Sequence, residues 1–435
     1  MRYLLNALYV VVLIALLPRL VWAGMRKGKY REGYAAKLWG QVPRRGGSAH
    51  CVWLHAVSVG EVNLLAPLIQ QIRACHPDWD CVITTTTMTG FALARTRYAD
   101  LVVCYCPLDF SWAVNHAMER LRPDLLVLAE LELWPNLISA ARRRGAKVAV
   151  VNGRLSERSF RGYRRFSLVY RRVLSQLNLV AAQNEQYAER FRALGARSAA
   201  VHVTGSIKFD GAQTDRGNPA TARLRQLAGI TSDDIVWLAG STQPIEEELV
   251  LRTYLALREE FPRLRLILVP RHPEHFAITR RMLDAAGVAW QRRTELDRSG
   301  SFPAARVLLV NVVGELGAWW GTADVAFVGG SLTDRGGQNM IEPAAYGAAV
   351  SFGPNTWNFR DVVEAMLAAD AAVVVRDGDQ MAAFVRRALT DPRWAAAMGQ
   401  RAQLLVRGQL GATQRTFDLL ETLLPAEAPA TAAAA

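Results

Sequence analysis

Short apolar runs alternate with amphipathic segments along most of this 435-residue chain. In the first half, runs suited to strands occupy residues 51–54, 81–86, 101–105, 125–128, 147–152 and 177–182. In the second half they occupy residues 235–239, 264–269, 306–310, 325–329, 348–352 and 371–375. Each run is followed by a helical pattern, as repeated βα units require. We therefore expect an α/β protein with two doubly wound parallel sheets.

Residues 211–221, with the sequence GAQTDRGNPAT, are rich in turn-forming residues and interrupt this alternation. They predict a linker between a first domain, residues 26–210, and a second domain, residues 222–424. Residues 394–424 have a helical pattern, and residues 425–435 form a low-complexity tail that we expect to be disordered. Two Rossmann-like domains with an interdomain cleft describe the glycosyltransferase B (GT-B) architecture.

The N-terminal segment is apolar from residue 3 to residue 25, apart from Asn6, Pro18 and Arg19. About 20 apolar residues span a bilayer, so residues 1–25 predict an uncleaved membrane anchor. The basic residues that follow it would keep the rest of the chain on the cytoplasmic side; they are Arg26, Lys27, Lys29 and Arg31. A cleaved signal peptide fits less well, because Trp22 lies near the cleavage site and the N-terminal charge is weak. A helix that lies in the membrane interface stays an open interpretation.

Positive charge is concentrated in the first half of the chain. Residues 1–210 carry 29 Lys and Arg against 14 Asp and Glu, whereas the remainder carries 23 against 25. Seven arginines recur at helical spacing beside an apolar face formed by Tyr163, Phe166, Tyr170 and Val173; they are Arg154, Arg158, Arg161, Arg164, Arg165, Arg171 and Arg172. This pattern favours a phosphate-bearing or anionic lipid partner over a merely solvated face. No nucleic-acid-binding signature accompanies it, so no nucleic-acid partner is expected.

The cysteines and acidic pairs give no metal or disulfide signal. The five cysteines are odd in number and form no paired CxxC pattern, so reduced thiols are expected. Asp377 and Asp379 have the spacing of a metal-binding sugar-transferase motif, but they lie in a predicted turn without an acidic partner. His272 and His275 alone do not make a zinc set. We expect no metal site and no cofactor.

The stretch of residues 329–359 reads as a strand end, a glycine-rich turn, a short helix and a second strand. Its glycines, above all Gly329, Gly330, Gly336 and Gly337, would let backbone amides approach a phosphate closely. Asn339 and Glu342 are three residues apart and would share a helix face, where the carboxylate could bind a ribose diol. A tight turn that caps a helix is the simpler alternative.

Four ionisable residues of the first domain lie at or after the ends of predicted strands, where ligands of such folds bind. Glu61, in HAVSVGE, opens the helix after the first strand and could take a proton from a hydroxyl, or merely complement the helix dipole. Glu130 and Glu132, in LAELELWPN, end another strand and would lie on one face. Lys208 closes the domain and could meet a negative group, with a plain surface lysine as the alternative.

Three strand-end loops of the second domain would converge with the glycine-rich turn. They begin at Gly240, at Arg271 and at Gly314. Arg271 could bind a phosphate or base, or form a structural salt bridge. The amides near Gly240 and Gly337 would then stabilise a phosphate.

The chain closely resembles the 3-deoxy-D-manno-octulosonic acid (Kdo) transferases, membrane-anchored enzymes that move Kdo from CMP-Kdo onto a lipid A precursor. The resemblance covers nearly the whole chain. It rests on HAVSVGE, ELWPN, NGRLSERSFRGYRRF, AAQNEQYAERFRALGA, VTGSIKFD, LILVPRHPE, FVGGSL, RGGQNMIEPAA and FGPNTWNF, in this order.

This resemblance implies a metal-independent, inverting transfer at the inner (cytoplasmic) membrane, with lipid IV-A as acceptor and Glu61 as proton acceptor. Glu130 and Lys208 match positions assigned to transition-state stabilisation. The matched CMP-contacting residues are Pro270, Arg271, Val313, Gly314, Glu315, Asn339, Met340, Ile341 and Glu342. Asn311, Val312, Val313 and Gln338 depart from the usual family residues, which bears on nucleotide affinity more than on chemistry.

Two other functions are compatible with the residues. One is a GT-B enzyme for another nucleotide sugar or a related sugar-nucleotide epimerase. The other is a membrane-anchored protein that binds anionic lipid without catalysis, against which Glu61 and the nucleotide loops argue.

Overall fold

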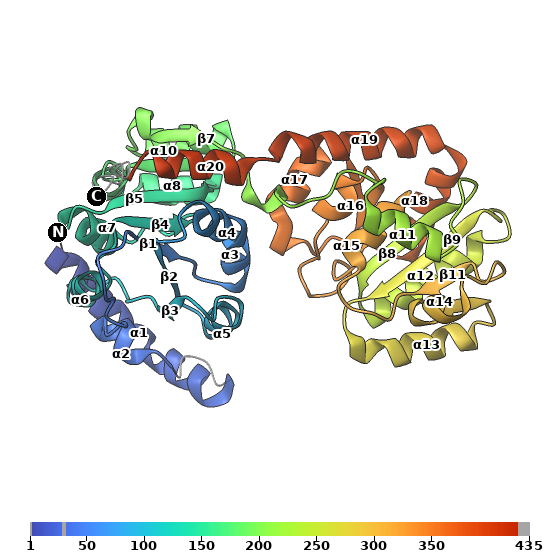
Figure 1. Ribbon diagram of the computed structural model, residues 1–435, viewed down its shortest axis with the longest axis horizontal. Helices are drawn as coiled ribbons and strands as arrows, with labels where there is room; N and C mark the ends of the chain where they lie inside the picture. The colour runs from blue at the N-terminus through green and yellow to red at the C-terminus, as the bar shows by residue number, and fades with distance from the viewer. Residues whose placement is uncertain (1, 28–31, 425–435) are drawn as a thin grey trace, which may run out of the picture. The chain divides into compact units, whose positions relative to one another are not determined.

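The computed structural model describes residues 2–27 and 32–424, which form two compact units. Unit 1 comprises the chain up to Asp210 together with the segment that begins at Gln409, and unit 2 comprises Gly211–Gly408. Lys29, Arg31 and the predicted tail at residues 425–435 lie outside the described residues. Figure 1 traces both units in chain order.

Unit 1 contains a seven-stranded parallel sheet in the order β3-β2-β1-β4-β5-β6-β7. Its strands are β1 Cys51–His55, β2 Asp80–Thr85, β3 Val102–Tyr105, β4 Leu125–Ala129, β5 Lys147–Gly153, β6 Leu179–Ala182 and β7 Val201–Val203. Its helices are α1 Arg2–Lys27, α2 Tyr34–Trp39, α3 Val59–Leu64, α4 Ala66–Cys75, α5 Met88–Arg97, α6 Ser111–Leu121, α7 Pro135–Arg143, α8 Glu157–Arg164, α9 Ser167–Leu174, α10 Glu185–Ala193 and α20 Ala412–Glu421.

Side chains of the unit 1 strands point alternately into two apolar clusters, one on each face of the sheet. Trp53 packs with residues of α6, α7 and α10, whereas its neighbours Val52 and Leu54 pack with residues of α3, α4 and α20. Both faces of the sheet are therefore covered, as the uninterrupted apolar runs predict.

Unit 2 repeats this plan with the parallel order β10-β11-β9-β8-β12-β13-β14. Its strands are β8 Ile235–Thr242, β9 Leu264–Pro270, β10 Trp290–Arg292, β11 Val307–Leu309, β12 Val325–Val328, β13 Ala349–Phe352 and β14 Ala372–Val374. Its helices are α11 Pro219–Leu227, α12 Pro244–Leu257, α13 Phe276–Ala285, α14 Arg293–Ser299, α15 Leu316–Trp319, α16 Ile341–Ala345, α17 Arg360–Ala368, α18 Gly378–Thr390 and α19 Pro392–Gln409.

In both sheets the chain order reverses beside the first strand, between β1 and β4 in unit 1 and between β8 and β12 in unit 2. Ligands of doubly wound sheets bind beyond the carboxyl ends of the strands at such a reversal. The loops that follow these four strands are therefore where a site is expected in each unit.

The ends of the predicted second domain differ from the structure. The predicted linker overlaps α11, whose cap Asn218 accepts a hydrogen bond from Thr221 N at 3.0 Å. The C-terminal helical pattern is broken at Gly411, which has a φ of 83°. The following helix α20, drawn in red, packs against α4 and β6 of unit 1 (Figure 1).

The basic helix predicted around residues 154–172 is two helices, α8 and α9, with the break at Phe166. Tyr163 and Tyr170 still pack together, at a ring separation of 4.2 Å. Phe166, however, is 65% exposed, so its prediction as part of the packed face is wrong. Phe166 is the non-helical residue before α9, with φ −114° and ψ 34°, so it does not continue the packed face of one helix.

Candidate active site

Glu61 lies at the start of α3, directly after β1. Its Oε2 accepts a hydrogen bond from Val57 N at 2.8 Å, and its Oε1 accepts one from Ser58 Oγ at 3.1 Å. The loop that carries it is fastened to the end of β2, because Thr86 N and Thr87 N both donate to Val57 O. The carboxylate is thus held in one orientation while each oxygen keeps a lone pair for a further donor.

Burial raises the pKa of Glu61 to about 7, and the nearby carboxylates of Glu132 and Glu130 add to this rise. The hydrogen bonds from Val57 N and Ser58 oppose it. A carboxylate with a pKa near neutrality accepts a proton far more readily than an ordinary one. The environment of Glu61 therefore suits a general base. A carboxylate that only complemented the helix dipole would not need this burial or the raised pKa.

Glu130 and Lys208 form an ion pair beside this loop. The Lys208 Nζ lies 2.9 Å from Glu130 Oε1, and the two side chains are 28% and 22% exposed. Glu130 follows β4 with a φ of 53°, a strained conformation of the kind that gathers at functional sites. Lys208 lies in a short 3-10 helix, Ile207–Phe209. It is therefore a paired, partly buried group, which disfavours the plain surface lysine.

Asn152, which the sequence interpretation placed only in a strand, contacts Glu130 and the residue that precedes Lys208. Its Nδ2 lies 3.5 Å from Glu130 Oε1, and its Oδ1 accepts a hydrogen bond from Ile207 N at 3.0 Å. It also has a positive φ, 53°, which Asn tolerates better than most residues. The sequence feature that could have indicated this role is an Asn at the end of a predicted strand.

Glu132 is the third carboxylate of the group. Its Oε2 accepts a hydrogen bond from Trp134 Nε1 at 2.8 Å. Burial raises the pKa of Glu132, and the charge of Glu130 raises it further. The structure thus brings Glu61, Glu130, Glu132 and Lys208 together at the carboxyl ends of β1 and β4.

In unit 2, the first part of the glycine-rich turn is already occupied by an anion of the protein itself. The fully buried Glu246 accepts hydrogen bonds from Gly330 N, Ser331 N and Leu332 N at 2.7 to 2.9 Å. It also accepts one from Gln243 N at 2.9 Å, which closes the start of α12. The prediction that the Gly330 amide meets a ligand phosphate is therefore wrong.

The amides of Gly329 and Gly337 are also used within the protein, since they donate to Gly240 O and Gly330 O. The close approach of β12 to β8 needs a glycine at position 329, because a Cβ there would lie 2.6 Å from Ser241 O. The glycines thus serve close packing of the two strand ends, and the predicted phosphate contact at Gly337 is not supported.

Asn339 and Glu342 do meet, as predicted. Asn339 Nδ2 donates to Glu342 Oε1 at 2.9 Å, and Asn339 Oδ1 accepts from Ile341 N at 3.1 Å. Asn339 precedes α16, so this is a helix-start contact and the two residues do not lie on one helix face. Met340 and Ile341 are buried.

Arg271 follows β9, which ends at Pro270, and its amide donates to Thr242 O at 3.0 Å. The side chain is exposed. Burial raises the pKa of Glu342, while hydrogen bonds and the positive charge of Arg271 oppose the rise. The loop after β9 and the first turn of α16 are thus neighbours in unit 2.

The loop of residues 313–315 divides into an exposed and a fixed part. Val313 is 78% exposed, and Gly314 has a φ of 94°. The Glu315 carboxylate is bound by the buried Arg293, with Nε–Oε2 at 2.7 Å and Nη2–Oε1 at 2.8 Å. It also accepts a hydrogen bond from Trp319 Nε1. The Glu315 carboxylate therefore has a structural role. A ligand could still bind the main chain of this loop.

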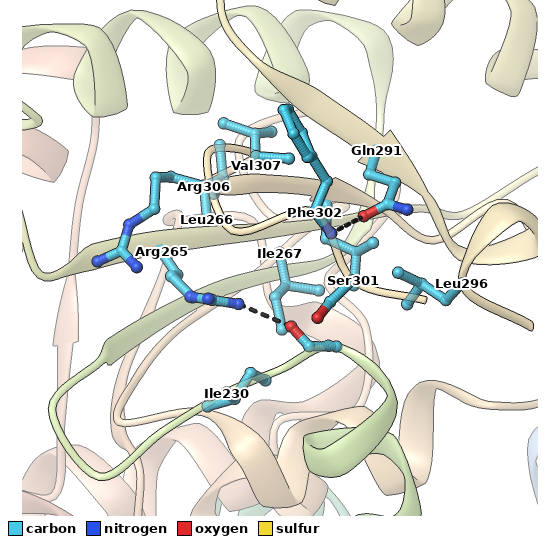
Figure 2. A pocket seen from close by; sticks show the side chains of 13 residues that line it. Ile230, Arg265, Leu266, Ile267, Gln291, Leu296, Ser301, Phe302, Arg306 and Val307 are labelled. Atoms are coloured by element: carbon cyan, nitrogen blue, oxygen red, sulfur yellow. Dashed lines mark hydrogen bonds between the residues drawn. The ribbon is translucent and has the colours of Figure 1, made fainter. Parts of the chain in front are cut away.

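A small pocket of unit 2 lies away from these residues (Figure 2). It is lined by the first residues of β9 and β11, including Arg265 and Val307, whereas Arg271 follows the last residue of β9. Within it, Arg265 donates to Ala228 O and Phe302 N donates to Gln291 Oε1. It lies at the amino ends of the strands and is not the expected nucleotide site.

Comparisons with known proteins match large parts of this chain. The model of the family "3-Deoxy-D-manno-octulosonic-acid transferase (kdotransferase)" matches residues 29–211. A 3-deoxy-D-manno-octulosonic acid transferase of Bordetella pertussis is 34% identical, over 96% of this chain and 99% of its own. One of Haemophilus influenzae is 32% identical, over 87% and 89%.

The chain belongs to the Kdo transferase family. It is accordingly a glycosyltransferase, as the sequence motifs predict. A solved glycosyltransferase of Rickettsia africae has the same fold, with a TM-score of 0.52 at 11% identity, over 87% of this chain and 99% of that one. The two seven-stranded parallel units of this Kdo transferase are thus those of the GT-B fold, which confirms the predicted fold class.

Within residues 2–27 and 32–424 of this Kdo transferase, no group of three or more His, Cys, Asp or Glu is arranged to hold a metal ion. Asp377 caps α18, because its Oδ1 accepts a hydrogen bond from Gln380 N at 2.8 Å. This agrees with its interpretation as a turn residue.

One helix in the described part of the chain is long and apolar enough to cross a membrane, in its segment Arg2–Arg19. By length and composition this fits the predicted anchor. The six arginines from Arg158 to Arg172 that lie on α8, on α9 and between them are exposed. Unit 1 of the Kdo transferase therefore combines an apolar helix with a basic surface.

Proposed function

We propose that this Kdo transferase moves Kdo from CMP-Kdo to lipid IV-A, a lipid A precursor, in lipopolysaccharide core biosynthesis, with Glu61 as general base. The observation that carries the proposal is the environment of Glu61. Its carboxylate is oriented by Val57 N and Ser58, lies at the reversal of strand order and has a pKa raised to about 7.

In the proposed step, a glucosamine hydroxyl of the acceptor attacks the anomeric carbon of Kdo on the face opposite CMP. The bond from that carbon to the phosphate oxygen breaks, and its electron pair leaves with CMP. The hydroxyl proton passes to Glu61. Because attack and departure occur on opposite faces, the configuration at the anomeric carbon is inverted.

Lys208 is proposed to offset negative charge that develops in the transition state of this step. Its ammonium is paired with Glu130, and Asn152 binds the backbone N–H of the preceding residue, Ile207, so the charge is in place before the substrate arrives. Such preorganised charge stabilises a transition state without further rearrangement. Glu130 would act on the reaction through Lys208.

The donor is proposed to bind to the loops of unit 2 beyond β9, β11 and β12. Arg271 is exposed and would meet the phosphate, while Glu342 would accept hydrogen bonds from the ribose hydroxyls. The remaining proposed contacts are Pro270, Val313, Gly314, Glu315, Asn339, Met340 and Ile341, with Val313 and Gly314 acting through their main chain. Arg271 would supply positive charge for the phosphate, and we propose that no divalent metal or other cofactor is needed.

We propose that the enzyme lies on the cytoplasmic face of the inner membrane, attached by α1. The exposed arginines of α8 and α9 would attract the phosphates of the acceptor and of anionic lipids. The protruding Phe166 and Leu168, 65% and 85% exposed, would meet the acyl region. No role for nucleic acid is proposed.

The test offers the purified full-length chain lipid IV-A in vesicles with either CMP-Kdo or a UDP-sugar, and measures nucleotide release. The proposal expects CMP release that depends on lipid IV-A and no UDP release. Release of UDP would instead indicate a transferase for another nucleotide sugar. Formation of an epimerised UDP-sugar would indicate a sugar-nucleotide epimerase.

A further inference from the structure

The apolar helix α1 is fastened to unit 1 by two polar side chains in its N-terminal half, Asn6 and Tyr9. Asn6 is 8% exposed; its Nδ2 donates to Ser111 Oγ at 2.7 Å and its Oδ1 accepts from Ser111 N at 3.0 Å. One turn further on, Tyr9 OH donates to Asp109 Oδ2 at 3.0 Å. Both partners lie at the start of α6, beside which α1 runs in Figure 1.

This fastening continues into the rest of unit 1. The buried Asp109 also accepts hydrogen bonds from Asn136 N and Leu137 N, at 3.0 and 2.8 Å, in the first turn of α7. Tyr9 packs edge-on against Phe110, at 6.1 Å between ring centroids. The helix is therefore docked on the α/β unit through its N-terminal half and is not a free tether.

The N-terminal end of α1 also stays beside the unit. Burial, and after it the positive charge of Arg2, lowers the pKa of Arg143, which lies in the last turn of α7. Arg2 is therefore close to a charged residue of the α/β unit.

This docking is incompatible with a helix that crosses the bilayer. If Arg2–Arg19 spanned the hydrocarbon core, its midpoint would lie near Val10, and Tyr9 would be about 2 Å from the midplane. Asp109 and the starts of α6 and α7 would then be pulled to the same depth. Open sheets and irregular loops are not tolerated in lipid, and each charge there costs roughly 3 kcal/mol or more.

The remaining surface of α1 and its surroundings fit the membrane interface. The helix exposes large apolar side chains on its other faces, namely Tyr3, Leu4, Leu8, Val11, Val12, Ile14, Leu16 and Leu17. Beside it, Trp39 of α2 and Trp112 of α6 are 60% and 43% exposed, and Trp112 stacks on Phe110. Exposed tryptophans of this kind are enriched at the level of the lipid headgroups.

From this geometry we infer that α1 lies in the plane of one leaflet, docked on unit 1 through Asn6 and Tyr9, and does not span the bilayer. In this orientation Arg2 and Arg19, which lie at different points along α1, both reach the same layer of anionic headgroups. The inference rests on the proposed membrane-bound function and defines how the enzyme meets the surface that holds its acceptor.

The test measures how deep nitroxide labels lie in anionic vesicles that carry the full-length chain. The exposed native Cys75 is replaced by Ser, while the other four cysteines are buried. Single labels are placed with Leu4→Cys, Leu8→Cys, Val11→Cys and Ala15→Cys, four exposed positions on one face of α1. An in-plane helix gives depths that agree to about 3 Å, whereas a spanning helix separates positions 4 and 11 by about 10 Å. The second result would overturn the inference, as would labels that meet only water.

A double variant, Asn6→Leu with Tyr9→Phe, tests the role of the docking bonds. Without them the depths at positions 4 and 11 should diverge, and an unchanged profile would show that these bonds do not set the orientation. Kdo transfer by the unlabelled parent chain is measured in parallel. Absence of transfer contradicts the proposed function, whereas the depth profile reports the orientation of α1 in either case.

Discussion

Replacing Glu61 by Gln should affect catalysis and stability in opposite directions. Gln keeps the size of the side chain and can still accept the hydrogen bond from Val57 N, but it cannot take a proton. We expect turnover to fall by roughly 100-fold or more, the usual scale of general-base catalysis, with little change in the KM for CMP-Kdo. Glu189→Gln, at an exposed position of α10, is the matched control and should leave both unchanged.

The stability effect follows from the pKa of about 7 in the folded state, against roughly 4.3 in the unfolded chain. Between these two values the folded state binds more protons, so stability falls as the pH rises through this window. Above pH 7 the ionised carboxylate costs about 4 kcal/mol, a cost that is absent below pH 4. Glu61→Gln should therefore be more stable than the wild type at pH 8.5, with the gain shrinking toward pH 4.

Hydrogen exchange of the β1 and β4 amides at pH 5 and 8.5 measures this local stability, and the pH dependence of kcat/KM measures the chemistry. The wild-type rate should fall below about pH 7, where Glu61 becomes protonated. Two results would refute the reasoning. One is a variant that loses donor binding and turnover equally. The other is a variant less stable than the wild type at pH 8.5, which would make Glu61 a helix-capping residue.

Further outcomes follow from the other contacts of the two units. Lys208→Met should lower turnover at least tenfold, because it removes the cation that pairs with Glu130. The control Lys147→Met, at the start of β5, should leave turnover unchanged. Equal turnover of the two variants would show that Lys208 has no role in the mechanism. Glu246→Gln should destabilise unit 2 by roughly 2 to 4 kcal/mol, because a buried carboxylate that accepts four backbone N–H groups is lost, and urea unfolding checks this. Binding to vesicles with lipid IV-A should weaken between 50 and 500 mM salt, and co-sedimentation that ignores salt would contradict a role for the basic surface. Transfer should persist in EDTA, and its loss, restored by Mg²⁺, would show that a metal is required.

Most of the fold could be predicted from the sequence, because strands buried on both faces leave uninterrupted apolar runs. The two strands without a prediction, β7 and β10, are three residues long and only partly buried. Such short edge strands are defined by pairing with a neighbour, which leaves little local signal. The sequence also did not predict that α20 belongs to unit 1. That membership depends on packing against α4, which is remote in the chain.

The candidate site was predictable where residues follow strands at the reversal of chain order. Glu61 and Glu130 were found in this way, since the carboxyl ends of β1 and β4 meet. The occupation of the glycine-rich turn by Glu246 was not, because glycine spacing describes an anion-binding backbone without saying which anion fills it. Asn152 was missed because its role depends on contacts with Glu130 and Ile207, both distant in sequence.

The most direct test of the account is a single-turnover reaction of wild type and Glu61→Gln with saturating CMP-Kdo and lipid IV-A, followed by mass analysis of the lipid. We expect the wild type to add Kdo to the lipid, whereas the variant binds CMP-Kdo but forms product at least 100-fold more slowly. Equal rates for the two proteins, or a wild type that leaves lipid IV-A unchanged, would contradict it.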